Sequence, residues 1–232
     1  MDKFEYFTGV PEVGIVPRAP HVGPLLQHVH EQEHGRGGFA GRVSHTYHLY
    51  PPNNWLPGET LVLEGWAPHW ESPLRPLGGV HHALGVARPP EPSDVYRGMA
   101  RLVANATVAM NVTAPTAPMD YFFEHHSATL VFFIHEGSGT LETTFGPLAY
   151  GKGDFLIVPK GITHRFELDA GPQYYWVYES FTGDPEKAEA VTTGQVLTHS
   201  RSDYKFPRSL DTRNEAGRFE VISKVGRAYT RR

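Results

Sequence analysis

The sequence contains no cysteine, and this absence excludes disulfides, thiolate zinc sites, iron–sulfur clusters and cysteine nucleophiles. It also lacks an excess of charge of either sign, because 21 lysines and arginines stand against 25 aspartates and glutamates for a net charge of −4. Nothing in this balance suggests a polybasic patch. We therefore expect neither nucleic acid nor a membrane surface among its partners.

Long apolar runs are absent as well. No stretch of 18 apolar residues occurs, so the sequence predicts no transmembrane helix. The first 14 residues lack the apolar segment of a secretory signal peptide, and from this we expect a cytoplasmic protein.

Turn-forming and aromatic residues are plentiful. The 232 residues include 24 glycines and 20 prolines, yet 40% are hydrophobic and 12% aromatic. This mixture is typical of a folded, turn-rich all-β protein. Seven short β-branched and aromatic runs at about ten-residue spacing predict the strands of a sandwich, jelly roll or barrel, at residues 107–112, 121–124, 130–135, 139–144, 155–159, 164–167 and 174–178.

These strands suggest three parts of the chain. Residues 1–100 are predicted to form an N-terminal arm with accessory strands, among them an edge strand at 43–50 and a short strand at 61–65. Residues 101–182 are predicted to form the core barrel. Residues 183–232 are predicted to hold a short helix followed by a C-terminal strand and connection.

Helix signals are few. Asp184 followed by Pro185 predicts a helix start that leads into residues 187–190. Residues 94–103 are a second, weaker helix candidate because they contain Gly98. The strand expected at residues 219–225 has little chain left to pair with, so we expect the natural polypeptide to continue beyond Arg232.

In the central segment, the spacing of two glycines, a proline and a histidine indicates a candidate functional residue. The segment predicts a turn at Gly153 that leads into a strand, and Pro159 is expected to end that strand. Gly161 then allows a tight reversal of the chain, so that His164 lies at the start of the next strand. A histidine in this position can point into a barrel.

The second candidate feature is an acid–histidine pair on a neighbouring strand. Glu124 and His126 are two residues apart and so share one face of a strand, whereas His125 faces the other way. If that face is the barrel interior, Glu124, His126 and His164 form a two-histidine, one-carboxylate set, the ligand type that suits non-haem Fe(II) with open positions for dioxygen and substrate. The alternative is that the two histidines are satisfied core or interface residues.

These motifs resemble those of the cupin superfamily, whose fold is a double-stranded β-helix or jelly roll. The second cupin motif matches through His164, but Leu168 stands in place of its usual asparagine. Aligning the first motif on Gly137 places its two histidines at Glu124 and His126 and its metal-binding glutamate at Leu130. The fold match is therefore better than the match of the metal site.

A closer resemblance is visible in GFAGRVSHTYH at residues 38–48, TAPTAPMDY at 113–121 and HEGSGTLETTFGPL at 135–148. These segments resemble the N-terminal half of the homogentisate 1,2-dioxygenase family, which cleaves the ring of homogentisate with O2 in tyrosine and phenylalanine catabolism. The resemblance covers most of the chain, from about residue 38 to 225.

The resemblance implies an oxygenase whose Fe(II) is bound in a C-terminal cupin half, so no family iron ligand maps onto this sequence. The expected partners are a small aromatic acid, O2, and either further copies of the chain or that C-terminal half. Two alternatives remain open: a stand-alone metal-binding cupin acting on a small aromatic acid, and a non-catalytic cupin assembly or binding module.

Overall fold

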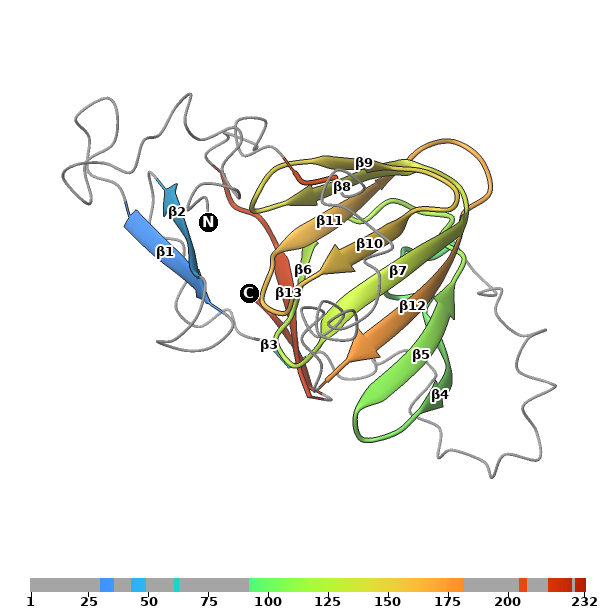
Figure 1. The fold of residues 1–232 in the computed structure, drawn as a ribbon, viewed down its shortest axis with the longest axis horizontal. Helices are drawn as coiled ribbons and strands as arrows, with labels where there is room; N and C mark the ends of the chain where they lie inside the picture. The colour runs from blue at the N-terminus through green and yellow to red at the C-terminus, as the bar shows by residue number, and fades with distance from the viewer. Residues whose placement is uncertain are drawn as a thin grey trace, which may run out of the picture.

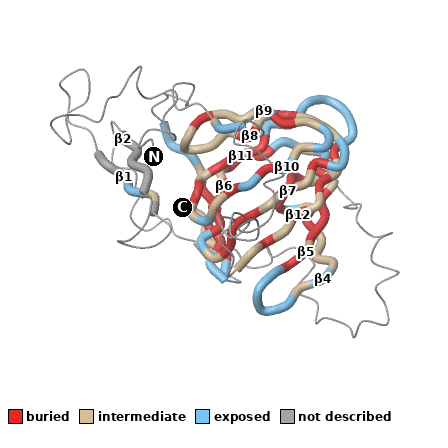
Figure 2. Tube along the Cα trace, viewed as in Figure 1, coloured by how far each residue is buried: buried red, intermediate tan, exposed pale blue. Residues whose placement is uncertain are grey.

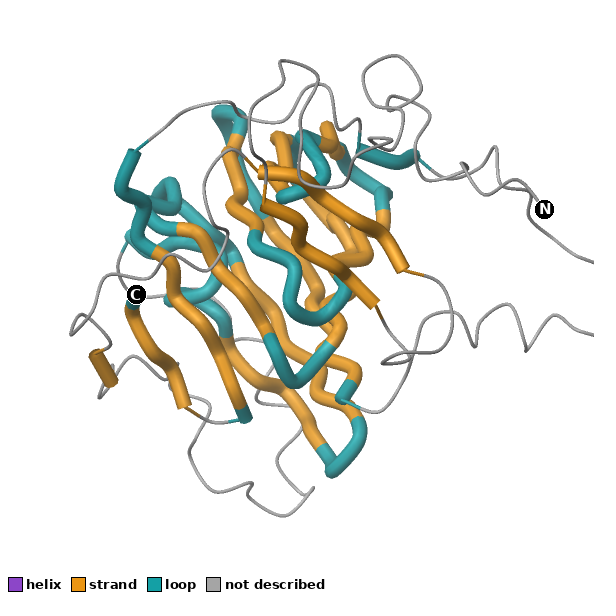
Figure 3. Tube along the Cα trace, turned by 90° about the vertical axis from the view of Figure 1, so that its left-hand side faces the viewer, coloured by secondary structure: helices purple, strands orange, loops and turns teal. Residues whose placement is uncertain are grey.

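The computed structural model describes residues 30–35, 43–48, 61–62, 92–181, 205–207, 217–226 and 228–232, and within these ranges it contains strands and turns but no helix (Figures 1 and 3). The helix predicted at residues 184–190 lies outside the described residues. The described part also has no helix long and apolar enough to cross a membrane.

Eight strands form a barrel of two facing sheets. They are β5 (Val108–Thr113), β6 (Phe122–His125), β7 (Thr129–Glu136), β8 (Gly139–Thr143), β9 (Leu148–Tyr150), β10 (Phe155–Val158), β11 (His164–Leu168) and β12 (Tyr174–Ser180). They pair from the outside inward, since β5 pairs with β12, β6 with β11, β7 with β10 and β8 with β9, all antiparallel. This pairing is the double-stranded β-helix of a cupin jelly roll, and the predicted fold class is confirmed.

Accessory strands extend both sheets. The five-stranded sheet has the order β10-β7-β12-β5-β4, and the seven-stranded sheet has the order β3-β14-β13-β6-β11-β8-β9. A separate antiparallel pair contains two further strands. The bounds of the accessory strands are β1 His30–Gly35, β2 Val43–His48, β3 Leu61–Val62, β4 Ala100–Ala104, β13 Val221–Val225 and β14 Ala228–Arg231.

All seven strands predicted for the core are present, and the glycines act as expected. Gly153 has a φ of 92° before β10, and Gly161 has a φ of 78° before β11, a conformation that favours glycine at both turns. Strand β9 was missed because its three residues are too short to show a periodic pattern.

Two expectations were wrong. Residues 94–103 are not helical: residues 95–98 form a turn, and β4 follows at Ala100, where it pairs with β5. The strand near the C-terminus does have a partner, because β13 turns at Gly226 and pairs antiparallel with β14. A glycine with a φ of 59° suits such a tight turn.

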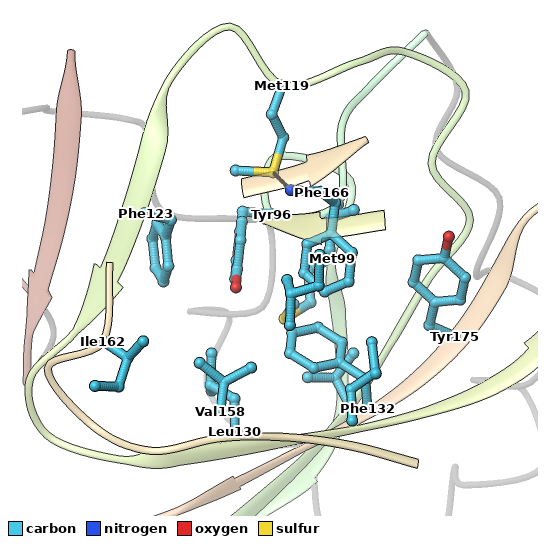
Figure 4. Packing of buried hydrophobic residues seen from close by; sticks show 14 of the residues in the cluster. Tyr96, Met99, Met119, Phe123, Leu130, Phe132, Val158, Ile162, Phe166 and Tyr175 are labelled. Atoms are coloured by element: carbon cyan, nitrogen blue, oxygen red, sulfur yellow. Dashed lines mark hydrogen bonds between the residues drawn. The ribbon is translucent and has the colours of Figure 1, made fainter. Parts of the chain in front are cut away.

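The core lies between the two sheets and is largely aromatic. Phe166 of the seven-stranded sheet contacts Phe132 of the five-stranded sheet, with ring centroids 4.8 Å apart. Tyr96, in the turn before β4, stacks on Phe123 at 3.8 Å and so fills the space between the sheets (Figure 4). Figure 2 shows buried residues running along the barrel strands, with exposed residues at the hairpin ends.

Candidate functional site

His164 lies inside the barrel and is fully buried. Its Nδ1 is 2.8 Å from the carbonyl oxygen of Ile162, which can only accept, so Nδ1 carries the proton. Nε2 is therefore the acceptor of the hydrogen bond that the Tyr96 hydroxyl donates. Burial lowers the pKa of His164 to about 4, so this ring is neutral.

Glu124 and His126 are in contact with each other, as their spacing predicts, with the Glu124 Oε2 to His126 Nε2 distance at 3.0 Å. Thr163 donates a hydrogen bond to the other carboxylate oxygen, and Ser223 Oγ donates to Oε2 at 3.1 Å. Burial opposes ionisation of Glu124, but these hydrogen bonds outweigh it and lower the pKa of the carboxyl.

The structure does not bring these two residues together with His164. In the β6–β11 ladder His164 is directly opposite Phe123, so it shares the core-facing side of the sheet with Phe123. Glu124 is the next residue along β6 and points to the opposite side, where Thr163 and Ser223 meet it. The face shared by Glu124 and His126 is therefore not the barrel interior.

This arrangement does not fit an iron centre. No group of three or more His, Cys, Asp or Glu side chains is placed to hold a metal ion anywhere in the described ranges. The third position of the expected motif is Leu130, which faces the core and is 2% exposed. The Fe(II) ligand set expected from Glu124, His126 and His164 would need side chains from both sides of one sheet.

A different polar cluster occupies the barrel interior, and we call it the Glu179 cluster. Lys224 Nζ lies 2.9 Å and His125 Nε2 3.2 Å from Glu179 Oε2. On the other carboxylate oxygen, Asn111 Nδ2 lies at 3.1 Å and Arg101 Nη2 at 3.3 Å. Glu179, His125, Lys224 and Asn111 are each no more than 3% exposed.

The protonation state of the cluster follows from its hydrogen bonds. His125 Nδ1 accepts from the backbone N–H groups of Ser127 and Ala128 at 3.2 and 3.0 Å, so its proton is on Nε2 and is donated to Glu179. Burial lowers the pKa of His125, which keeps the ring neutral. Burial opposes ionisation of Glu179 as well, but its hydrogen bond from His125 and the charge of Lys224 hold its pKa at about 2.

The cluster ties the two sheets together. Glu179 and Asn111 lie on β12 and β5 of one sheet, and His125 and Lys224 lie on β6 and β13 of the other. The hydrogen bonds from His125 and Lys224 to Glu179 therefore cross the space between the sheets.

Sequence reasoning missed this cluster, although a signal was present. Lys224 interrupts the apolar strand 221–225, and Glu179 follows the aromatic run that begins at Tyr174. A charged residue at an inward position of an apolar strand must be paired, because an unpaired buried charge is too costly. The alternation alone does not say which positions point inward.

The buried histidines make the stability of the fold dependent on pH. An unfolded histidine has a pKa of about 6.5, whereas that of His164 is about 4 in the folded chain. Below pH 6.5 the unfolded chain therefore binds protons that the folded chain does not, and stability falls as the pH drops towards 4. The pKa of His125 is shifted in the same direction.

We expect the free energy of unfolding to fall by about 2–3 kcal/mol through His164 between pH 7 and pH 4.5, measured by urea unfolding. His164→Gln should make this pH dependence shallower, and His135→Gln, at an exposed ring, should leave it unchanged. An equally steep dependence in His164→Gln would contradict the assignment.

With the fold and the site described, the class of protein is clear: the chain is a cupin-type jelly roll whose interior holds an ion-paired cluster. Residues 110–200 match the AraC-like ligand binding domain family. The chain is 23% identical over 221 residues to a protein of Saccharolobus solfataricus whose name proposes a dioxygenase activity, covering 91% of this chain and 55% of that protein.

The chain is also similar to homogentisate 1,2-dioxygenase. The enzyme of Rhodopseudomonas palustris strain BisA53 is 32% identical over 103 residues, which cover 44% of this chain and 23% of the enzyme. These comparisons bear out the resemblance seen in the motifs. The chain thus spans about half the length of the first relative and a quarter of the second.

Among solved structures, a cupin-2 domain protein of Shewanella frigidimarina aligns with a TM-score of 0.32 and 15% identity, covering 35% of this chain and 78% of that protein.

Proposed function

We propose that this chain is the N-terminal cupin portion of a homogentisate-dioxygenase-like enzyme, a non-haem iron oxygenase that cleaves the ring of a small aromatic acid with O2 in tyrosine and phenylalanine catabolism. The similarity to the Saccharolobus protein over 91% of the chain supports the oxygenase assignment. The coverage of 55% of that relative supports a second half that this chain does not contain.

The Glu179 cluster is the main observation that supports a structural role for this barrel within such an enzyme. In the barrel interior a lysine ammonium is bound to a carboxylate at 2.9 Å, an ion pair in place of a set of metal ligands. Iron binding by a C-terminal cupin half, or by another chain of the assembly, is the arrangement that we propose, since no group of three or more His, Cys, Asp or Glu side chains in the described part of this chain is placed to hold a metal ion. This barrel serves as its scaffold and interface.

A second candidate is a non-catalytic cupin that binds a small ligand or assembles with other proteins. The match of residues 110–200 to the AraC-like ligand binding domain family favours it. The two candidates differ in whether the chain, together with its natural partner, consumes oxygen.

Metal analysis of the purified chain after anaerobic incubation with Fe(II) tests the role of the barrel. We expect no stoichiometric iron, because no group of three or more His, Cys, Asp or Glu side chains in the described residues is placed to hold a metal ion. Stoichiometric iron that is lost in both His126→Ala and His164→Ala would overturn this proposal and support a stand-alone metal cupin with Glu124, His126 and His164 as ligands.

Oxygen uptake tests the enzymatic assignment. A tagged chain purified anaerobically from its source organism should carry a partner with iron and consume O2 when homogentisate is added, whereas the recombinant chain alone should not. Benzoate, which lacks the two ring hydroxyls, is the control substrate. An iron-free native preparation that is inactive with homogentisate would favour the binding module.

A further inference from the structure

Tyr96 reaches the barrel core from outside the barrel wall. It lies in the turn of residues 95–98, which we call the Tyr96 turn, and not on one of the eight barrel strands. Its ring nevertheless lies between the two sheets and is 5% exposed (Figure 4). The space that this ring occupies is therefore enclosed by the barrel but filled by a neighbouring segment, and we call it the ring site.

One polar group of the barrel is directed at the ring site. His164 Nε2 accepts the hydrogen bond that the Tyr96 hydroxyl donates, while Nδ1 donates to the carbonyl oxygen of Ile162. His164 is fully buried, so Nε2 has no access to solvent. Any group that replaces Tyr96 must bring a hydrogen-bond donor, because a buried acceptor without one costs free energy.

The other walls of the ring site are aromatic. Phe123 stacks on the Tyr96 ring with the centroids 3.8 Å apart. Phe132 and Phe166 lie at steep angles to it, with centroids at 6.4 and 6.5 Å. Apolar walls with one convergent polar group are typical of small-molecule sites. A neutral phenol has both features that these walls select, a ring for the phenylalanines and a hydroxyl for His164.

The Tyr96 turn is held in place by an aspartate but carries unsatisfied polar atoms. Asp94 Oδ1 accepts hydrogen bonds from the backbone N–H groups of Tyr96 and Arg97, each at 2.9 Å, and it accepts another from the Tyr121 hydroxyl at 2.9 Å. In the described part of the chain, Ser93 Oγ is buried without a hydrogen-bond partner, and Asp94 Oδ2 has an ion pair with Arg97 at 3.3 Å but no hydrogen bond. Such atoms are costly in a folded core, so they lower the free energy needed to move the turn outward.

We propose that the ring site binds a small neutral phenol and that Tyr96 occupies it as an autoinhibitory plug. Ligand and plug make the same contacts, so each excludes the other. The apparent dissociation constant is the intrinsic one divided by the fraction of chains whose turn has left the core. Weakening the hold of Asp94 on the turn therefore raises the affinity without changing the ring site.

The proposal concerns a site within this barrel and does not depend on the oxygenase chemistry. The two assignments can fail separately, since this one is measured by phenol binding and the other by iron content and oxygen uptake.

Calorimetric titration of the full chain with phenol and with toluene tests the ring site. Tyr96→Ala removes the plug, and it should bind phenol at least about tenfold more tightly than toluene, which has the same ring but no hydroxyl for His164. The wild-type chain should bind phenol at least about tenfold more weakly than this variant, because its plug must leave first. The matched control is the double variant Tyr96→Ala, His164→Phe, which lacks the acceptor and should bind the two ligands alike.

A second pair of variants tests the plug in a chain that keeps Tyr96. Asp94→Ala should lower the apparent dissociation constant for phenol by about three- to thirtyfold, the effect expected from the loss of such a capping side chain. Asp120→Ala is the control, because the Asp120 side chain is 78% exposed and pairs with Arg97 at 3.5 Å without holding the turn. It should bind phenol like the wild type.

Two results would overturn the proposal. One is a Tyr96→Ala chain that binds neither ligand or binds both equally. If this variant is too unstable for titration, thermal unfolding replaces it, and a Tm that phenol does not raise above its value with toluene has the same meaning. The other is a folded Asp94→Ala chain whose affinity for phenol equals that of the wild type.

Discussion

Glu179→Gln is expected to lower the free energy of unfolding by about 3–5 kcal/mol, because it removes the carboxylate charge that pairs with the buried Lys224 ammonium and with Arg101. Four donors converge on the Glu179 carboxylate, two on each oxygen. A glutamine keeps the shape but offers one oxygen, so an amide N–H₂ group would face one pair of these donors. Urea unfolding measures the loss.

Glu167→Gln is the matched control, since the Glu167 side chain is 51% exposed and pairs with Arg165. We expect it to cost less than about 1 kcal/mol. Lys224→Met supplies a double-mutant cycle: with Glu179→Gln it should show a coupling of about 1–3 kcal/mol, the double variant being less destabilised than the sum. Strict additivity would mean that the two side chains do not interact.

Phe166→Ala is expected to cost about 3–5 kcal/mol as well, for a different reason: it empties the centre of the aromatic core. Phe166 is 1% exposed, and its ring lies 4.8 Å from that of Phe132 and 6.0 Å from that of Tyr175 (Figure 4). Because it joins the two sheets, its neighbours cannot close the gap without moving a strand. Thermal unfolding should show a Tm lower by roughly 10 °C.

Val225→Ala is the control for this variant, because it removes apolar atoms at a residue that is 54% exposed. It should change stability by less than about 0.5 kcal/mol. A Phe166→Ala variant that unfolds at the wild-type urea concentration would show that this ring does not hold the sheets together.

The positions of the core strands could be predicted because their signals are local. The strand 155–158 is bounded by Gly153 and Pro159, and both Gly153 and Gly161 adopt the positive φ that their places in the turns suggested. Signals of this kind depend on residues a few positions apart. The hairpin at Gly226 and the strand β4 were misjudged because each becomes a strand only by pairing with a partner, β13 with β14 and β4 with β5.

The candidate site could be predicted only in part from local sequence signals. The sequence by itself determined that Glu124 and His126 share one face of a strand and His125 the other, because side chains alternate along any strand. Only the tertiary structure decided which of these two faces lies inside the barrel. It did so by pairing Phe123 with His164 on neighbouring strands, and His125 with Lys224, which is 99 residues further along the chain. The closed barrel brings Glu179 and its partners together from five separate strands. No local pattern encodes such a contact, because it exists only when the sheets close on each other.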